Sequence, residues 1–321
     1  MRVLVTGGSG YIGAHVCRLL RDRGDTVVVV DDFVTGIRER VAEFAQLELS
    51  LAEPGAADAV AAFAREHAVD AVIHFAGRKQ VPESVAKPLM YWNDNVAGLA
   101  AVLQACESVG IERFLFSSSA AVYGDASGHV TEDAPCHPVN PYGASKLAGE
   151  WLTADVARVT GLRATSLRYF NVAGAGWPEL ADTAVLNLVP MVMERLAAGN
   201  APRMFGDDYA TVDGTCVRDF IHVLDLAEAH LAALDALETA APGSHRVFNV
   251  GTGVGGSVRE VVEGLRARWP HATPAPVVEP RRPGDPAEVV AGPSRIAAEL
   301  GWRATRTLDD ILDSVIAARG Q

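Results

Sequence analysis

A glycine-rich segment near the start of the chain constrains the fold more than any other feature of the sequence. The run Thr6-Gly7-Gly8-Ser9-Gly10-Tyr11-Ile12-Gly13 lies between an apolar stretch, Arg2–Thr6, and an amphipathic one, Tyr11–Arg23. Glycines in this setting allow a tight turn, a close approach of the backbone to phosphate and close packing of helix on sheet. The helix that follows offers free N–H groups and the positive end of its dipole to an anion. The segment therefore predicts the phosphate-binding loop of a dinucleotide site.

Short apolar stretches alternate with amphipathic ones through the first half of the sequence. We expect strands at Arg2–Thr6, Thr26–Asp31, Gln46–Leu51, Ala71–Phe75, Arg113–Ser117 and Leu162–Tyr169. We expect helices at Tyr11–Arg23, Ala56–His67, Pro88–Gly110 and Tyr142–Gly161. Strands that alternate with helices form a parallel sheet with helices on both faces. The pattern predicts an α/β fold of the doubly wound, Rossmann type.

The alternation loosens after residue 170. Loop-like runs at 174–182 and 206–214 separate shorter elements, and the proline-rich stretch 270–293 is predicted to be mostly extended or loop. We expect further helices at Val223–Leu237, Val258–Trp269 and Leu308–Ala318. The prediction is a cofactor-binding domain of residues 1–170, which also receives a later segment at roughly 215–250, and a smaller, discontinuous substrate lobe made mainly of residues 171–321.

Composition argues against several classes of function. The formal net charge of −12 repels a phosphate backbone, so we expect no nucleic-acid partner. No apolar run is long enough to span a bilayer, and the N-terminus enters the first predicted strand without a signal-peptide pattern, so we expect no membrane association. The cysteines, Cys17, Cys106, Cys136 and Cys216, form no C-x-x-C pair, which predicts reduced thiols, no metal site and a cytoplasmic location.

An acidic residue closes the second predicted strand. Asp31 follows the glycine motif by about 20 residues, the position from which a carboxylate bonds the ribose hydroxyls of an adenosine. A carboxylate there repels the 2′-phosphate of NADP, and the nearest downstream arginine is Arg38. Asp31 therefore favours NAD as the cofactor.

Three residues are candidates for catalysis. Ser119 follows the end of a predicted strand, and Tyr142 and Lys146 lie four positions apart, on one face of a predicted helix. A free tyrosine has a pKa near ~10, and we expect the Lys146 ammonium, together with a positive nicotinamide ring, to lower the pKa of Tyr142. Tyr142 can then take a proton from a substrate hydroxyl while Ser119 hydrogen-bonds the same oxygen. A Tyr-x-x-x-Lys pair alone is common on exposed helix faces, and the preceding glycine motif and Asp31 favour the catalytic interpretation.

Together these residues resemble the extended short-chain dehydrogenase/reductase family and, within it, the UDP-galactose 4-epimerases. The motifs that carry the likeness are MRVLVTGGSGYIG at the start, VIHFAG at 72–77, FSSSAAVYG at 116–124, NPYGASK at 140–146, LRYFNVAG at 167–174, FGDDYATVDGTCVRDFIHVLDLAEAH at 205–230, NVGTGVGGSV at 249–258 and RRPGD at 281–285. The glycine motif and the Tyr-x-x-x-Lys pair mark only the superfamily, whereas the blocks at 205–230 and 281–285 are more specific to the 4-epimerases.

The resemblance implies an NAD-dependent, reversible epimerisation at C4 of a UDP-hexose, UDP-galactose to UDP-glucose, through a 4-keto sugar. It implies that Ser119, Tyr142 and Lys146 form the catalytic triad, that residues 171–321 mainly bind the nucleotide sugar, and that the protein is a homodimer. The expected NAD contacts are Gly7, Gly10, Tyr11, Ile12, Gly13, Asp31, Asp32, Phe33, Val34, Thr35, Gly36, Ser50, Leu51, Phe75, Ala76, Gly77, Lys79, Asp94, Ser117, Tyr142, Lys146, Tyr169 and Phe170. The expected UDP-sugar contacts are Lys79, Ser119, Tyr142, Asn171, Asn187, Leu188, Arg203, Phe205, Arg218, Arg282, Asp285 and Val289.

Some positions depart from the family pattern. Ser50 stands where an Asp that contacts adenine is usual, and Asp94 stands where an Asn near the cofactor is usual. The loop at 174–182, which borders the sugar site, looks shorter than in many relatives. Val289 stands where relatives carry either a bulky tyrosine or a small residue, and the small version is associated with room for an N-acetyl group. We therefore expect UDP-GlcNAc and UDP-GalNAc to be accepted as well.

Three other functions are compatible with parts of the sequence. A nucleotide-sugar 4,6-dehydratase needs an Asp-Glu pair after its catalytic Ser or Thr, and here Ala120 and Ala121 follow Ser119. A 4-epimerase for another UDP-sugar, such as a pentose or uronic acid, stays open. A non-catalytic NAD-binding sensor is possible on the same fold, but such a protein is expected to have lost Tyr142 or Lys146.

Overall fold

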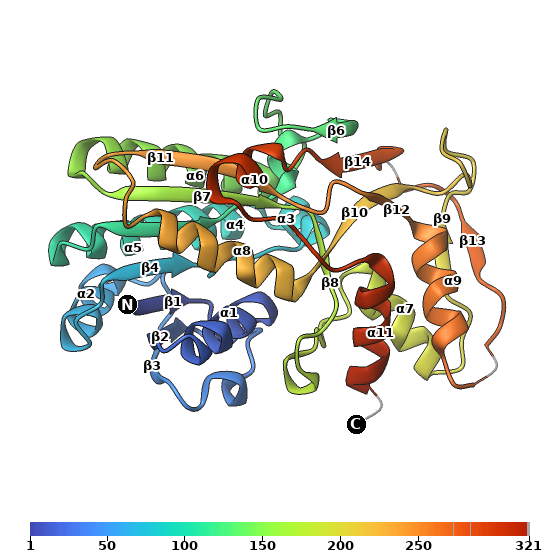
Figure 1. Ribbon diagram of the computed structural model, residues 1–321, viewed down its shortest axis with the longest axis horizontal. Helices are drawn as coiled ribbons and strands as arrows, with labels where there is room; N and C mark the ends of the chain where they lie inside the picture. The colour runs from blue at the N-terminus through green and yellow to red at the C-terminus, as the bar shows by residue number, and fades with distance from the viewer. Residues whose placement is uncertain (272, 283, 320–321) are drawn as a thin grey trace.

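The computed structural model describes residues 1–271, 273–282 and 284–319, and a parallel β-sheet forms its centre (Figure 1). The described strands of this sheet follow the order β11-β7-β5-β4-β1-β2-β3, with every neighbouring pair parallel. They are β1 (Arg2–Thr6), β2 (Thr26–Asp31), β3 (Ala45–Glu48), β4 (Ala71–His74), β5 (Arg113–Ser117), β7 (Arg163–Tyr169) and β11 (His245–Val250). The strand order reverses at β1, and open α/β sheets bind ligands in the crevice at the carboxyl ends beside such a reversal.

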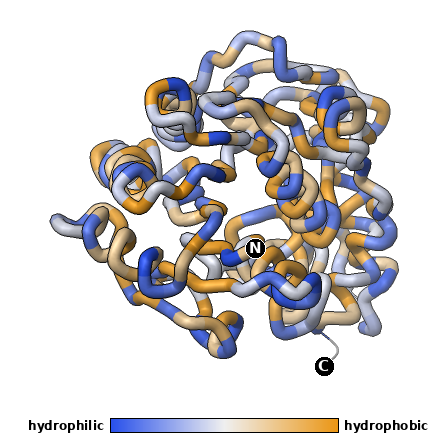
Figure 2. The backbone as a smooth tube through the Cα atoms, turned by 60° about the vertical axis from the view of Figure 1, so that its left-hand side comes forward, coloured by the Kyte–Doolittle hydropathy of each residue, from blue (hydrophilic) through white to orange (hydrophobic). Residues whose placement is uncertain are grey.

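Helices cover both faces of the sheet because its strands are apolar on both sides. On β1, Val3 and Val5 belong to one buried cluster and Leu4 to the cluster on the opposite face, as the alternation of strand side chains requires. One face carries α1 (Tyr11–Asp22), α8 (Val223–Ala236) and α10 (Ser294–Leu300), and the other carries α2 (Ala56–Glu66), α5 (Gly98–Val109) and α6 (Pro141–Thr160) (Figure 1). Hydrophobic and hydrophilic residues alternate at short intervals along the chain (Figure 2). The predicted doubly wound fold is confirmed.

The helix expected at Pro88–Gly110 is continuous but irregular. It consists of α4 (Pro88–Trp92), a π-helical turn η2 (Asn93–Ala97) and α5, and a short helix that the pattern did not predict, α3 (Val81–Ala86), precedes it. A π turn accommodates an extra residue and is frequent at functional sites. Here the turn carries two side chains that hydrogen-bond to Arg78, in the loop after β4.

A second, smaller group of elements packs beyond the carboxyl ends of the main sheet (Figure 1). Its strands are β6 (Gly128–Val130), β8 (Asn171–Ala173), β9 (Arg203–Phe205), β10 (Val217–His222), β12 (Gly255–Ser257), β13 (Val277–Glu279) and β14 (Glu288–Ala291), and its helices are α7 (Leu188–Ala197), α9 (Val258–Arg268) and α11 (Leu308–Arg319). Short helical turns lie at η1 (Arg38–Val41), η3 (Ala120–Tyr123) and η4 (Pro178–Leu180).

The C-terminal half contains elements that the sequence pattern did not predict. The stretch 270–293, expected to be mostly extended or loop, contains the short strands β13 and β14, and its residues 272 and 283 lie outside the described residues. Helices α7 and α10 were not predicted. The segment after β10 returns to the main sheet, where α8 lies on one face and β11 pairs with β7. The division at residue 170 stays a prediction. Among the described residues, no helix combines the length and the apolar character needed to cross a membrane.

A buried ion pair fixes α6 to the sheet. The guanidinium of Arg168, on β7, donates to both carboxylate oxygens of Glu150, on α6, over 2.9 and 2.6 Å, and the two side chains are 7% and 4% exposed. Glu150 also accepts a hydrogen bond from Ser118, and Arg168 donates to the hydroxyl of Tyr123 at 2.9 Å. A bidentate pair of this kind sets the orientation of α6 as well as its position.

Replacing Glu150 by Ala should leave the Arg168 charge buried without a partner and lower the free energy of unfolding by about 3–5 kcal/mol. Urea unfolding of the purified protein measures this change. The matched control is Glu112→Ala, which removes the exposed partner of Arg163 and should cost only about 0–1 kcal/mol. Equal and small effects of the two substitutions would contradict a structural role for the buried pair.

Candidate active site

The glycine loop after β1, called the glycine cradle below, packs so closely on its neighbours that Gly7 and Gly13 leave no room for a side chain. Gly7 has φ +70°, and a Cβ atom added there would lie 2.6 Å from the backbone nitrogen of Ala76. A Cβ at Gly13 would collide with the carbonyl of Gly7. Gly10 caps α1 without a side chain, so the helix N-terminus presents its backbone N–H groups outward. The loop fits a phosphate group that must approach the backbone closely.

Asp31 lies at the edge of this cradle. Its carboxylate accepts hydrogen bonds from the backbone nitrogens of Ser9, at 3.0 Å, and Phe33, at 2.9 Å, and the residue is 7% exposed. A carboxylate has about four lone-pair sites, so two remain for the hydroxyls of a ribose. Arg38 stacks on the ring of Phe33 at 3.7 Å and pairs with Glu48 at 2.5 Å. Its charge is already engaged, which favours NAD over NADP.

The other residues expected at the adenosine end line the loops after β2 and β3. Asp32, Val34 and Thr35 are exposed, and Gly36 is so close to Ser9 that a Cβ atom there would collide with it. Leu51 is buried in the core cluster beneath the sheet, and Ser50 is half-buried beside it. These positions stay proposed cofactor contacts.

The three candidate catalytic residues come together from two elements. Ser119 follows β5 and caps η3, where its hydroxyl accepts from the nitrogen of Ala121 at 3.1 Å. Asn140 caps α6 by accepting from the nitrogen of Gly143 at 2.9 Å, so Tyr142 lies in the first turn and Lys146 in the second. Ser119, Tyr142 and Lys146 are all buried.

Burial shifts the protonation equilibria of Tyr142 and Lys146. Burial raises the pKa of Tyr142 above its ordinary value, and a hydrogen bond with Ser119 opposes this rise. Burial also lowers the pKa of Lys146 to about 8, against the charge of Glu150. The Lys146 amine donates to the carbonyl of Ser117 at 2.8 Å. The lowering of the Tyr142 pKa that Lys146 and a positive nicotinamide ring are expected to cause together stays a prediction, because in the protein alone burial is the largest influence on Tyr142.

The loop after β4 closes one side of the triad. Gly77 has φ +151°, and a Cβ there would lie 3.0 Å from the Asn95 side-chain oxygen and 3.9 Å from the Lys146 amine. Phe75 and Ala76 are half-buried in this loop, and Lys79 is exposed. Asp94, a proposed cofactor contact, accepts a hydrogen bond from Arg78 at 2.6 Å. Sequence reasoning gave Arg78 no individual role, although a basic residue in a cofactor loop was a signal.

The strand β7 joins the triad to the second lobe. The hydroxyls of Tyr169 and Ser117 lie 2.5 Å apart. Phe170 is buried in a small cluster with Val122 and Leu147, and Asn171 begins β8. This connection leads to a second cavity, separate from the glycine cradle, and Asn171 is one of the residues that line it.

That cavity has a volume of about 360 Å³, and most of the residues expected to hold the UDP-sugar line it. They are Asn171, Asn187, Leu188, Arg203, Phe205, Arg218, Arg282 and Asp285. The guanidinium of Arg282 lies 3.8 Å from the centre of the Phe205 ring, and Arg218 is 3.7 Å from the carboxylate of Asp285. The structure thus brings together arginines that are far apart in sequence.

Other expected substrate contacts lie outside this lining. Lys79, Ser119 and Tyr142 belong to the triad side, and Val289 lies on β14, opposite Arg218 in the β10–β14 register. Residues that sequence reasoning missed also line the cavity, among them Met191 and Glu194. They come from α7, whose apolar periodicity was the available signal.

The loop at 174–182 is held against the cofactor helix. Tyr11 donates through its hydroxyl to the carbonyl of Gly174 at 2.6 Å, and the nitrogen of Gly176 donates to the His15 ring at 3.0 Å. Arg18 stacks over Trp177 at 4.2 Å. α1 therefore contacts the loop expected to border the sugar. Among the residues that the structure describes, no group of three or more His, Cys, Asp or Glu side chains is placed to hold a metal ion.

Comparisons with known proteins agree with this geometry. Residues 3–251 match the model of the NAD dependent epimerase/dehydratase family. The chain is 47% identical to a UDP-glucose 4-epimerase of Azospirillum brasilense, over 94% of this chain and 86% of that protein, and 44% identical to one of Corynebacterium glutamicum, over 96% and 92%. It is similar to the crystal structure of a UDP-glucose 4-epimerase from Stenotrophomonas maltophila with bound NAD and formylated UDP-arabinopyranose, with a TM-score of 0.93 and 37% identity over 100% and 98% of the two chains.

The family match covers the whole cofactor half of the chain, including the glycine cradle, Asp31 and the triad. The full-length relatives extend the likeness through the second lobe. The chain therefore belongs to the NAD-dependent epimerase/dehydratase family, within its group of UDP-glucose 4-epimerases.

Proposed function

We propose that this protein interconverts UDP-galactose and UDP-glucose by epimerisation at C4, with NAD⁺ held as a prosthetic group. One observation carries the proposal. The triad of Ser119, Tyr142 and Lys146 lies beside the loop after β4 that packs on the glycine cradle, and Asn171, soon after β7, lines the cavity that holds Arg218 and Arg282. The family and its relatives support the same activity.

Tyr142 is the group that we propose moves the proton of the sugar 4-hydroxyl. NAD⁺, when bound, supplies the hydride acceptor for C4. Because burial raises the pKa of Tyr142, the phenolate needs positive charge nearby. With a pKa of about 8, the Lys146 amine is mostly protonated at neutral pH and supplies part of it. Ser119 holds the oxygen that Tyr142 deprotonates.

The second cavity is proposed to anchor the nucleotide while the 4-keto sugar turns over. Arg218 and Arg282 offer guanidinium forks that match the geometry of a diphosphate. Asp285 lies beside Arg218 and limits the directions in which that guanidinium points. Phe205, now covered by Arg282, offers an aromatic face for uracil once the arginine turns to the diphosphate.

The direct test is to incubate the purified protein with UDP-galactose, without added NAD⁺, and to follow the sugar signals by NMR. Formation of UDP-glucose to an equilibrium mixture is expected. If no conversion occurs, with or without added NAD⁺, the hexose assignment is withdrawn and other UDP-sugars are screened.

Two further features of the protein bear on its oligomeric state and its location. The exposed apolar side chains Val85, Leu89, Trp92 and Trp151 lie on α3, α4 and α6, which pack beside one another. Such a patch on neighbouring helices suits a second copy of the same chain, so we propose a homodimer.

All four cysteines are free, which suits a reducing compartment and supports a cytoplasmic location.

Substituting Tyr142 by Phe should lower kcat by roughly 10²–10⁴, because general acid–base catalysis contributes about that factor. The affinity for UDP should be unchanged, since the nucleotide cavity is intact. Steady-state kinetics and UDP titration measure the two quantities. As a control, Tyr91→Phe removes a buried tyrosine hydroxyl that bonds the backbone of Gln80 outside the triad, and it should keep most of the turnover. Full turnover by the Tyr142 variant would rule out this residue as the base.

The short side chain of Val289 should admit an N-acetylated sugar. The wild-type protein is expected to interconvert UDP-GlcNAc and UDP-GalNAc, and Val289→Tyr should reduce kcat/KM for UDP-GlcNAc by roughly tenfold or more while sparing UDP-galactose. Kinetics with both substrates decide this. A wild-type protein that leaves UDP-GlcNAc untouched contradicts the prediction.

Placing a charge in the apolar patch should separate the proposed dimer. Trp151 is 63% exposed on α6, and Trp151→Glu should give monomers because a carboxylate is costly to bury. Light scattering after gel filtration gives the mass. Val212→Glu, at another exposed apolar position, should leave the mass unchanged. A wild-type protein with the mass of a monomer would contradict the proposed homodimer.

A further inference from the structure

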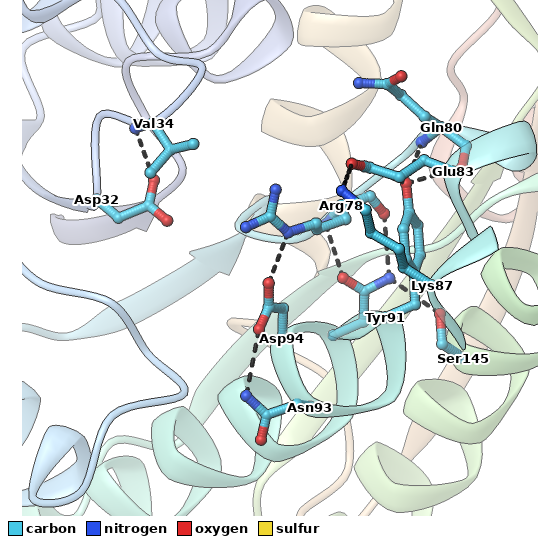
Figure 3. Close-up of polar contacts among 11 residues, drawn as sticks. Asp32, Val34, Arg78, Gln80, Glu83, Lys87, Tyr91, Asn93, Asp94 and Ser145 are labelled. Carbon is cyan, nitrogen blue, oxygen red and sulfur yellow. Dashed lines mark hydrogen bonds and ion pairs between the residues drawn. The ribbon is translucent and has the colours of Figure 1, made fainter. Parts of the chain in front are cut away.

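An ion pair beside the triad is not explained by the roles assigned so far. The Nε of Arg78, in the loop after β4, donates to the carboxylate of Asp94, on the π turn η2, at 2.6 Å. Both side chains are partly buried, at 29% and 26% exposure. The second oxygen of Asp94 accepts from the Asn93 side chain at 3.2 Å, so the carboxylate is held from two sides (Figure 3).

The backbone of Arg78 is fixed as firmly as its side chain. Asn95 accepts from the Arg78 nitrogen at 2.7 Å and donates to the Arg78 carbonyl at 3.0 Å. The same amide donates to the hydroxyl of Ser145 at 2.9 Å, and Ser145 donates to the carbonyl of Tyr142. The hydroxyl of Tyr91 bonds the backbone of Gln80 two residues on. The loop therefore keeps its shape relative to α6, and the guanidinium has one main direction.

That direction leads across the sheet edge. Figure 3 shows the guanidinium of Arg78 pointing from its loop toward the loop that carries Asp32 and Val34. The hydrogen bond to Asp94 raises the pKa of Arg78 against the effect of burial, and the charges of Asp94, Glu83 and Asp32 add to the rise. Neither terminal amino group of Arg78 makes a hydrogen bond to any residue that the structure describes. Two donors of a fixed cation thus face the space between the loops after β4 and β2.

We propose that Arg78 binds the diphosphate of NAD⁺ through these two amino groups, and that Asp94 is the positioning residue that aims them. A dinucleotide held by the cradle after β1 must pass between the loops after β2 and β4, because β1 lies between β2 and β4 in the sheet. Its diphosphate is the anionic part of the molecule at that point. A guanidinium fork suits two phosphate oxygens. Arg78 therefore slows the loss of the cofactor from the protein.

A simpler role for Arg78 has to be separated from this one. Arg78 could serve only to neutralise Asp94, whose carboxylate would otherwise stand unpaired near the cofactor. The two roles differ once Asp94 is replaced by Asn. In a variant that lacks Arg78, replacing Asp94 by Asn should restore cofactor retention if Arg78 only neutralises Asp94. If Arg78 binds the diphosphate, the same replacement cannot restore the lost phosphate contact.

The experiment follows the exchange of bound NAD⁺ against an excess of ¹⁴C-labelled NAD⁺ in the full-length holoprotein, without sugar nucleotide. The result is therefore independent of the sugar that the protein acts on. Arg78→Leu should exchange about tenfold faster than the wild type, because it loses charge-assisted hydrogen bonds. Arg78→Leu/Asp94→Asn should stay several-fold faster. Arg2→Leu removes an Arg–Asp pair at the opposite end of β1 and should exchange at the wild-type rate.

Two results would overturn the proposal. If the Arg78→Leu variant exchanges NAD⁺ at the wild-type rate, Arg78 does not bind the diphosphate. A double variant that returns to the wild-type rate shows that Arg78 only neutralises Asp94. If Arg78→Leu does not fold, Arg78→Lys gives the answer, since lysine keeps a cation beside Asp94 without the fork. Faster exchange of the lysine variant supports the proposal, and an unchanged rate contradicts it.

Discussion

The buried pair between Arg168 and Glu150 determines where the reacting groups can lie. Glu150 is on the same helix as Tyr142 and Lys146, and Arg168 is on β7, the strand beside β5, after which Ser119 follows. A bidentate contact with almost no exposure leaves α6 one orientation on the sheet. Tyr142 and Lys146 therefore face the carboxyl end of β5, where the glycine cradle and the second cavity also open.

The same burial has opposite effects on the two titrating groups. Removing water raises the pKa of Tyr142 and lowers the pKa of Lys146 to about 8, because the charged form is disfavoured in each case. The pocket by itself thus keeps the phenol protonated. A positive nicotinamide ring, when NAD⁺ is bound, and the Lys146 ammonium would favour loss of the Tyr142 proton. In this account the protein becomes a proton acceptor only when the cofactor is in place.

Local motifs allowed much of the fold and half of the site to be predicted from sequence. The cradle, Asp31 and the Tyr142–Lys146 pair each depend on a few neighbouring residues in a recognisable strand or helix context. The grouping of Arg218 with Arg282 depends on long-range packing, and only the family resemblance indicated it. The π turn that brings Asp94 to Arg78 leaves no mark in a helical pattern. The rise in the Tyr142 pKa that burial causes could not be predicted either, because desolvation depends on the packing of the whole site.

The central claim is that the hydrogen on C4 stays within the protein during turnover while Tyr142 handles only the hydroxyl proton. UDP-galactose deuterated at C4 tests this claim when the holoprotein converts it in ordinary water without added NAD⁺. The account predicts that the UDP-glucose formed keeps deuterium at C4, as read by NMR and mass spectrometry. Replacement of that deuterium by solvent hydrogen would contradict it.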